Sequence, residues 1–247
     1  MCKTMKDHFV IINWNATCTT LVDRIRSMQN EIASHGEIVL VSAPLGAPVS
    51  NLVVMPCDPL SKDIVETTNM RNARSVIILS PEGVAPDVAD TRNILIVMNL
   101  AQILPKGRVQ QPHITVEVHD PGKIHLLDNV EIPLDVVSAK AVTTDLIVQV
   151  AGNPGLTQIY SDLLSNEKDS SEIYSTPLSA KWHGKSFSDL CAMCAASRQT
   201  ASPVLPLAIS RGGKVHVNPS IKQISTLEVN DILFAVCDSL KDLKNLM

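Results

Sequence analysis

Three histidines recur at intervals of six residues, at positions 113, 119 and 125. His119 directly follows the β-branched run ITVEV (114–118), which contains Glu117, and Asp120 comes directly after His119. The carboxyl end of a strand is where α/β sheets present ligands, and alternate residues of a strand share a face. Glu117 and His119 could therefore hold a divalent cation. We favour the alternative of a polar strand end that faces solvent or a neighbouring subunit, because calcium takes six or more oxygen ligands.

A second candidate site is the turn NWNAT, residues 13–17, between an apolar run and an amphipathic stretch. A dinucleotide-binding turn needs glycines so that its backbone N–H groups can approach the pyrophosphate, and this turn has none. The acid that normally holds the ribose is also missing, because the next strand ends in VSAP, residues 41–44. NAD is therefore not expected. The two remaining interpretations are a crevice filled by side chains, or a smaller ligand beside Asn13, Trp14, Asn15 and Ser42.

The cysteines suggest no disulfide framework and no metal site. They lie at positions 2, 18, 57, 191, 194 and 237, a scatter typical of a reducing compartment. Cys191 and Cys194 form a CAMC motif, but they share a helical stripe with Phe187 and Leu190, and no second ligand pair lies at zinc-site spacing. We interpret both as buried core thiols. The sequence also has no nucleophile-base-acid arrangement, P-loop or HExxH motif, so it gives no support for an enzyme.

Composition narrows the class of protein further. Hydrophobic residues make up 45% and aromatic residues 3%, which predicts an aliphatic core of the kind found under parallel sheets. The net charge is −4 and no basic block occurs, so nucleic acid is not expected as a partner. No apolar run reaches the ~20 residues that span a bilayer, and the first strand begins too early to leave room for a signal peptide. The expected location is the cytoplasm.

Strand and helix patterns alternate over residues 1–138. This alternation predicts an α/β fold, a Rossmann-like parallel sheet with helices on both of its faces. Strands are expected over 10–13, 37–41, 52–55, 75–79 and 114–118, with an added edge strand over 130–133. Helices are expected from about 21 to 32, over 62–69 and over 87–104.

The expected helix over 87–104 is apolar almost all round, so both of its sides should be buried. One side would face the sheet. For the other side we favour a second subunit over a second domain of the same chain, because such surfaces rarely stay exposed. Leu95 and Met98 are the residues expected at that interface. Asp87 and Asp90 in the first turn are expected only to complement the helix dipole.

The pattern changes after residue 138. Two apolar helical stretches separated by GNPG predict a helix-turn-helix crossover over 139–166. A small α+β subdomain is expected over 167–247, with a helix over 187–197 and a short helix at its end. Its strands are expected near 173 and over 204–209, 214–217 and 232–236.

With these features in place, the chain resembles the RCK family, the regulators of K⁺ conductance that form gating rings on channels. The first matching stretches are HFVIINWN (8–15) and CDPLSKDIVETTNMRNARSVIIL (57–79), in which Cys57 replaces a usual glycine. The next is DLIVQVAGNPGLTQIYSDLL (145–164), which resembles the family's crossover. The last is VNPSIKQISTLEVNDILFAV (217–236), in which Asn230-Asp231 stands where Gly-Asp is usual.

The resemblance implies a homo-oligomer that is paired through the crossover and closed into a ring of eight through the helices beside the sheet. The crossover residues expected at the pairing interface are Leu146, Val150, Leu156, Ile159, Tyr160 and Leu163. Ligand binding would shift the ring between geometries and open a K⁺ channel pore. That pore would lie in the same longer chain or on separate subunits.

The resemblance also bears on the ligand. Calcium-gated members use carboxylates at the ends of the fourth and fifth strands; here Glu117 matches one of them and His119 replaces another. A divalent cation is therefore the candidate cofactor, and the identity of the ligand stays open. Two other functions also stay open at this point: a soluble regulatory subunit of a K⁺ uptake transporter, and a degenerate NAD-linked oxidoreductase.

Overall fold

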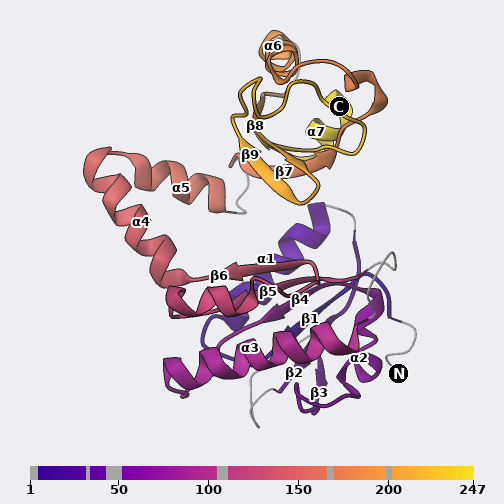
Figure 1. The fold of residues 1–247 in the computed structure, drawn as a ribbon, viewed down its shortest axis with the longest axis vertical. Helices are drawn as coiled ribbons and strands as arrows, with labels where there is room; N and C mark the ends of the chain where they lie inside the picture. Colours follow the sequence, from indigo (N-terminus) through magenta and orange to yellow (C-terminus); the bar gives the residue numbers. More distant parts are fainter. Residues whose placement is uncertain (1–4, 32–33, 43–51, 105–110, 166–169, 199–201) are drawn as a thin grey trace. The chain divides into compact units, whose positions relative to one another are not determined.

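The computed structural model describes residues 5–31, 34–42, 52–104, 111–165, 170–198 and 202–247 (Figure 1). The chain divides into two compact units, Met1–Ala151 and Gly152–Met247, here called the N-terminal and C-terminal units. The boundary falls inside the predicted crossover, at the end of its first helix.

The N-terminal unit is built on a six-stranded sheet in the order β3-β2-β1-β4-β5-β6, and all of its pairs are parallel. The strands are β1 (His8–Ile12), β2 (Ile38–Val41), β3 (Val53–Met55), β4 (Ala73–Ile78), β5 (His113–Glu117) and β6 (Leu134–Val137). The expected Rossmann-like α/β fold is confirmed. The strand order reverses between β1 and β4, and at such a switch point the carboxyl ends of the strands leave a crevice in many α/β proteins.

Alternation along β1 separates the two layers of the core. Phe9 and Ile11 join the apolar cluster under α1 (Cys18–Glu31). Val10 and Ile12 point to the other face and join the larger cluster under α2 (Ile64–Thr67) and α3 (Pro86–Ile103). Helices therefore cover both faces of the sheet, as the sequence predicts (Figure 1).

Several elements begin or end a few residues from their predicted bounds, and the edge strand is displaced most. The edge strand β6 begins at Leu134 instead of spanning 130–133. The carbonyl of Pro133 accepts the first inter-strand bond, from the N–H of Ile114 at 2.8 Å, and proline has no N–H with which to extend a ladder earlier. A 3₁₀ segment, η3 (Pro121–Leu127), fills much of the connection from β5 to β6. The helix predicted over 62–69 is shorter, because α2 contains only Ile64–Thr67.

The crossover contains the two predicted helices, α4 (Ala139–Gly152) and α5 (Leu156–Leu164). Gly155 precedes α5 with φ of +93°, a left-handed conformation that favours glycine. Neither helix has a buried residue. Both helices are rich in Val, Ile and Leu, residues that are normally buried in folded proteins. Their apolar side chains are therefore more exposed than is usual for these residue types.

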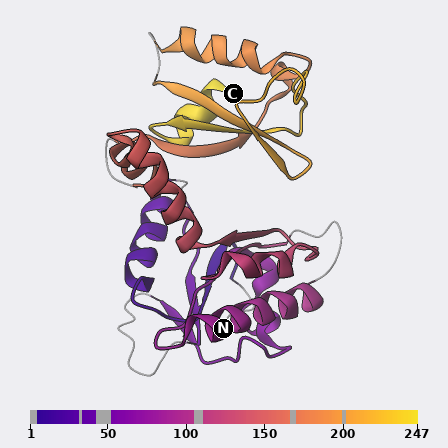
Figure 2. The same ribbon diagram turned by 60° about the vertical axis from the view of Figure 1, so that its left-hand side comes forward.

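The C-terminal unit, drawn in orange to yellow in Figure 2, contains an antiparallel sheet. Its strand order is β7-β10-β8-β9. Its strands are β7 (Glu172–Pro177), β8 (Val204–Arg211), β9 (Lys214–Val217) and β10 (Ile232–Cys237). The helices α6 (Phe187–Ser197) and α7 (Leu240–Leu246) and the short η4 (Ala180–Trp182) complete this unit, which confirms the expected α+β class. The Ser186 side chain accepts the N–H of Asp189, and the Asp189 carboxylate accepts the N–H of Ser186, a capping box that starts α6 at the predicted residue.

The CAMC cysteines belong to the core of this unit. Cys194 is buried, and Cys191 is half-buried and packs against the same apolar cluster. Burial raises the pKa of Cys194 to about 11, so its thiol stays protonated at neutral pH. In the part of the chain that the structure describes, no helix is both long and apolar enough to cross a bilayer.

Candidate functional site

The predicted crevice at the first turn is occupied by the protein's own side chains. Asn13, buried and in a left-handed conformation after β1, donates through Nδ2 to the carbonyl of Leu79 at 2.9 Å. Asn15 donates in the same way to the carbonyl of Ser80 at 3.0 Å. The N–H of Glu82 donates to the carbonyl of Trp14 at 2.9 Å. These three bonds join the turn after β1 to the segment after β4, across the switch point.

Ser42 and the side chain of Trp14, the other parts of this predicted site, also contact the protein itself. Ser42 follows β2 and donates through Oγ to the carbonyl of Cys57 at 3.1 Å. Trp14 is buried in the apolar cluster under α1. The structure thus places Asn13, Trp14, Asn15 and Ser42 at one edge of the sheet, but their polar groups bind backbone carbonyls or support the turn. This geometry favours the interpretation of a filled crevice.

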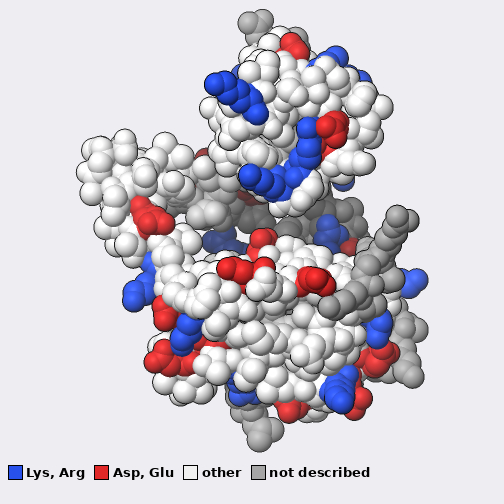
Figure 3. Space-filling view, viewed as in Figure 1, with Lys and Arg blue, Asp and Glu red and all other residues white. Residues whose placement is uncertain are grey.

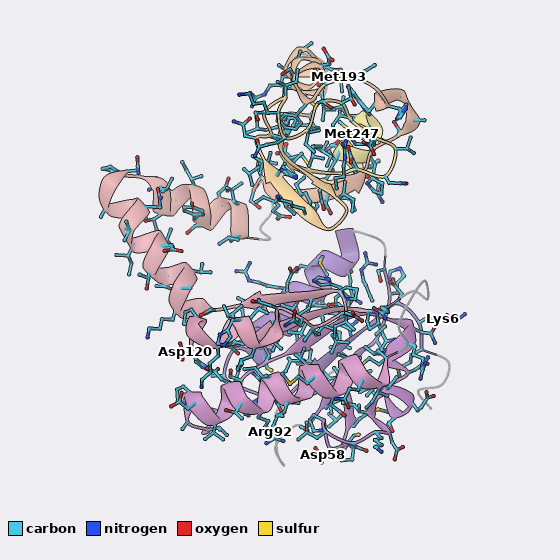
Figure 4. All side chains as sticks on the ribbon, viewed as in Figure 1. Lys6, Asp58, Arg92, Asp120, Met193 and Met247 are labelled. Carbon is cyan, nitrogen blue, oxygen red and sulfur yellow. The ribbon has the colours of Figure 1, made fainter. Side chains whose placement is uncertain are left out.

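An open cavity of about 470 Å³ lies beside it, at the carboxyl end of β5 and next to the first turns of α3 and α4. Asp120, labelled in Figure 4, belongs to this edge of the sheet. Acidic groups outnumber basic ones along its wall. The lining residues are Pro86, Asp87, Asp90, Glu117, Val118, His119, Asp120, Ala139 and Lys140.

Asp90 is the most constrained of these side chains. It is fully buried, and its two oxygens accept the backbone N–H groups of His119 at 2.7 Å and Asp120 at 3.0 Å. The Nδ1 atom of His119 lies 3.1 Å from Oδ1, and the Lys123 ammonium lies 3.7 Å from Oδ2. Burial acts to raise the pKa of Asp90, but these hydrogen bonds outweigh it and hold the pKa below its usual range. Asp90 is therefore an anion that ties α3 to the end of β5.

Asn93, one helical turn further along α3, makes a second tie. It is buried and donates through Nδ2 to the carbonyl of Glu117 at 2.9 Å. Its Oδ1 lies 3.3 Å from Nδ2 of Asn13. Positions 90 and 93 share one side of the helix. The cavity wall and α3 are thus joined by two buried polar side chains.

The two predicted metal ligands line the same cavity, but both have partners within the protein. The Glu117 carboxylate accepts the N–H of Ser80 at 2.8 Å. The ring of His119 is partly exposed, with Nδ1 shared between Asp90 and the Ser80 hydroxyl, which lies at 3.3 Å. Among the described residues, no three His, Cys, Asp or Glu side chains are grouped so as to hold a metal ion.

The other two histidines of the six-residue series lie elsewhere. His113, at the amino end of β5, contacts Asp135 with 2.9 Å between Nε2 and Oδ2. His125 is in η3, where its Nδ1 lies 2.6 Å from the carbonyl of Gly122. The regular spacing therefore does not bring the three rings together.

Sequence reasoning missed the importance of Asp90 and Asn93. The expectation that Asp90 only complements the helix dipole is wrong, because its carboxylate points inward and accepts buried N–H groups. A signal for this exists in the sequence. Positions 90, 93, 97 and 100 follow helical spacing on the buried side of α3, so a polar residue there needs a partner.

The residues expected at subunit interfaces are exposed to different extents. On α3, Leu95 is 48% exposed, whereas Met98 is half-buried and packs against the core. A second, open cavity of about 650 Å³ surrounds Leu95 and is also lined by Asp58, Leu60, Asp87, Val88, Thr91 and Arg92. Asp58 and Arg92 are labelled in Figure 4. In the crossover, Ile159 and Tyr160 are exposed, and the half-buried residues are Leu146, Val150, Leu156 and Leu163.

The fold is similar to that of a gating ring of known structure. The chain superimposes on the human SLO3 gating ring with a TM-score of 0.70 and 15% sequence identity, over 97% of this chain and 46% of that chain. The predicted likeness to RCK domains is confirmed at the level of the fold. No family model matches the sequence.

Sequence relatives also include ion channels. The chain is 26% identical over 228 residues to the probable ion channel CASTOR of Oryza sativa subsp. japonica. It is 25% identical over 228 residues to the ion channel POLLUX of Lotus japonicus. Each alignment covers 87% of this chain but 24% of the relative, so the chain spans about a quarter of the length of these channels.

Proposed function

We propose that this chain is the regulatory, gating-ring domain of a K⁺ channel, at the cytoplasmic face of the pore, and that it has no catalytic role. The observation that carries the proposal is a gating-ring fold whose crossover helices have no buried residue. Apolar helices of this kind need cover, and a second copy of the chain supplies it symmetrically. The similarity to CASTOR and POLLUX supports a channel as the partner.

Two surfaces would build the ring. In the first, α4 and α5 pair with the same helices of a second copy. The surface over these helices is mostly uncharged in Figure 3, as an apolar interface requires. In the second, the exposed side of α3 around Leu95 contacts the next pair. A ring needs both contacts, and we propose eight copies.

The cavity at the end of β5 is the ligand site that the geometry supports best. It is open, whereas the crevice at the switch point is bridged by three hydrogen bonds. Its acidic wall suits a divalent cation, with Glu117 and His119 as the protein ligands to test. The filled crevice also argues against an NAD-linked oxidoreductase.

Assembly gives the direct test of the proposal. Leu95→Asp should convert the parental oligomer into dimers, measured by light scattering coupled to size exclusion. Leu126→Asp is the matched control, because Leu126 is 47% exposed in the same unit but lies outside the proposed surface. Ile159→Asp should convert dimers into monomers. A parent that stays a folded monomer at every concentration, or equal masses for the two leucine variants, would contradict the proposed ring.

A thermal-shift titration tests the ligand separately. Calcium chloride, magnesium chloride and NAD are added to the parent and to Glu117→Gln. A ligand at a hundred times its dissociation constant stabilises by roughly 2.7 kcal/mol, a readily measured shift. We expect a divalent cation to stabilise the parent and not the variant. Stabilisation by NAD alone would contradict this assignment.

A further inference from the structure

One basic side chain already contacts the acidic wall of the cavity at the end of β5. The Lys123 ammonium donates to the carboxylate of Asp87 at 2.9 Å and lies 3.7 Å from Oδ2 of Asp90. Both carboxylates line the cavity. The wall therefore binds a positive charge that the chain itself supplies. A cation from solution would approach the same carboxylates and would meet this like charge.

The local fold places Lys123 at this position. Lys123 belongs to η3, the segment that follows β5. The Asp120 side chain accepts the N–H of Gly122 at 2.9 Å, and the Asp120 carbonyl accepts the N–H of Lys123 at 3.0 Å, so the chain forms a tight turn directly after the strand. The N–H groups of His119 and Asp120 are in turn held by Asp90. Lys123 is thus tethered to the wall by a short turn that Asp90 itself fixes.

The contacts of the Lys123 ammonium can be exchanged for others. The Asp87 side chain is 88% exposed, and an ion pair with so exposed a partner contributes little to stability. An ammonium is also a strongly hydrated point charge on a flexible stem, unlike the planar guanidinium that binds a carboxylate through two bonds. Since the Lys123 side chain is itself 25% exposed, water can solvate the ammonium when it leaves the wall.

We infer that Lys123 is a tethered cation bound to the acidic wall, and that a divalent cation binds in the cavity by displacing it. The inference rests on the proposed function, which assigns a divalent cation to this cavity, and it adds the exchange that binding requires. Lys123 belongs to η3 and Asp87 to α3, so the exchange breaks a direct link between these two elements. Binding at the cavity is thereby coupled to the helix that carries Leu95.

Calorimetric titration with calcium chloride and with magnesium chloride tests the exchange. Lys123→Met removes the tethered charge and keeps a stem of similar length. We expect this variant to lower the dissociation constant about tenfold or more, equivalent to about 1.4 kcal/mol or more. Lys123→Arg keeps the charge and should bind the cation no more tightly than the parent.

Lys140→Met is the matched control for the loss of charge. Lys140 lines the same cavity and is exposed on the first turn of α4. The ion pairs that the structure describes for Asp87 and Asp90 involve Lys123 and His119, and not Lys140. We therefore expect less than about a threefold change in the dissociation constant for Lys140→Met.

Chemical labelling follows the displacement itself. Acetylation of lysines by an N-hydroxysuccinimide ester is measured by mass spectrometry in the parent, with calcium chloride or with sodium chloride at the same ionic strength. Calcium should speed the acetylation of Lys123 about threefold or more, because the amine is released from Asp87. The acetylation of Lys62, which is exposed just before α2, should not change.

The outcomes separate this inference from the proposed function. If a cation binds the parent and Glu117→Gln removes that binding, but Lys123→Met and Lys140→Met have equal dissociation constants, the cavity is the cation site and the inference fails. Unchanged acetylation of Lys123 at saturating calcium would also overturn the inference. If neither cation binds the parent or Lys123→Met, both proposals fail. Binding to Lys123→Met but not to the parent would support the tethered cation.

Discussion

Among the residues that the structure describes, each unit contains one fully buried aspartate, and the two carboxylates have different partners. Asp231, in the C-terminal unit, binds Arg211 through two bonds, at 2.7 Å from Nε and 2.6 Å from Nη2. It also accepts the N–H of Glu228 at 2.8 Å. Asp90, in the N-terminal unit, contacts no arginine in the described part of the chain. Its partners are two backbone N–H groups and His119, with Lys123 slightly further away.

The difference separates a structural ion pair from an adjustable one. Arg211 is permanently charged and holds Asp231 in a bidentate geometry. The charge and orientation of the Asp231 carboxylate are therefore fixed by this one partner. The imidazole of His119, which contacts Asp90, is partly exposed and lines an open cavity. A cation in that cavity would therefore change the electrostatic environment of Asp90 directly. We expect regulation to act at Asp90, and Asp231 to act only through stability.

The largest effect is expected for Asp231→Ala. This change removes the bidentate acceptor of Arg211, which keeps only the Glu228 carboxylate and the Thr226 carbonyl, and it leaves the N–H of Glu228 without its acceptor. Breaking a buried ion pair by removing one partner costs about 3–5 kcal/mol. We expect about 3 kcal/mol, because Arg211 is partly exposed and water can solvate it. The chain has two tryptophans, both buried, with Trp182 in the C-terminal unit. Urea unfolding followed by Trp182 fluorescence in a Trp14→Phe background reports on this unit.

Asp238→Ala is the control for that measurement. Asp238 is exposed in the same unit and accepts only the Ser171 hydroxyl, at 3.0 Å, among the interactions the structure describes. Its loss should change the free energy of unfolding by less than about 0.5 kcal/mol, as is usual for surface residues. If the two alanine variants unfold at the same urea concentration, the Arg211–Asp231 pair is not the structural centre described here.

A smaller loss is expected for Asp90→Ala. Two buried N–H groups lose their acceptor, but the cavity beside them admits water, so we expect about 2 kcal/mol. Asp87→Ala is the control, because its side chain is 88% exposed one turn earlier on the same helix. Trp14 fluorescence in a Trp182→Phe background reports on the N-terminal unit. A loss equal to that of Asp231→Ala would remove the distinction between the two sites.

Acid should also weaken the N-terminal unit through Asp90. Its pKa is lower in the folded state, so the unfolded chain binds the proton more readily. The stabilisation by Asp90 is complete at pH values above about 3.9, the pKa of this carboxyl in the unfolded chain. It is lost as pH falls through the lower pKa that the carboxyl has in the folded state. The free energy of unfolding should therefore fall more steeply between pH 5 and pH 3 in the parent than in Asp90→Asn. Parallel curves for the two proteins would contradict this assignment.

The sequence predicted the elements well because each depends on a local pattern. The helix over 187–197 has its predicted ends, and strands such as β4 and β5 lie within two residues of prediction. The same local patterns could not show that Arg211 binds Asp231, twenty residues away, or that Asp90 reaches the backbone after β5. These contacts depend on how separate elements pack. The predicted metal ligands Glu117 and His119 do line the same cavity. The sequence could predict this because both residues lie at the carboxyl end of one strand, β5.

His8 shows a third way to bury an ionisable group, and it carries the smallest prediction. The side chain is fully buried in β1, and its Nε2 lies 2.9 Å from the carbonyl of Thr68. No described residue binds Nδ1. Burial lowers the pKa of His8, against the raising effects of the Thr68 bond and of Asp7, so the folded protein holds a neutral ring.

The pH dependence of stability tests this interpretation of His8. Below its ordinary pKa of 6.5, the unfolded chain binds a proton that the folded chain does not, so stability falls as pH decreases. Between pH 7 and pH 5.5 the parent should lose up to about 1 kcal/mol more than His8→Gln, whose amide can still donate to Thr68. Urea unfolding with Trp14 as reporter gives both values. If the parent instead loses less stability than His8→Gln over this pH range, His8 is charged in the folded protein. Asp7, next to it in the chain, would then balance its charge as Arg211 balances that of Asp231.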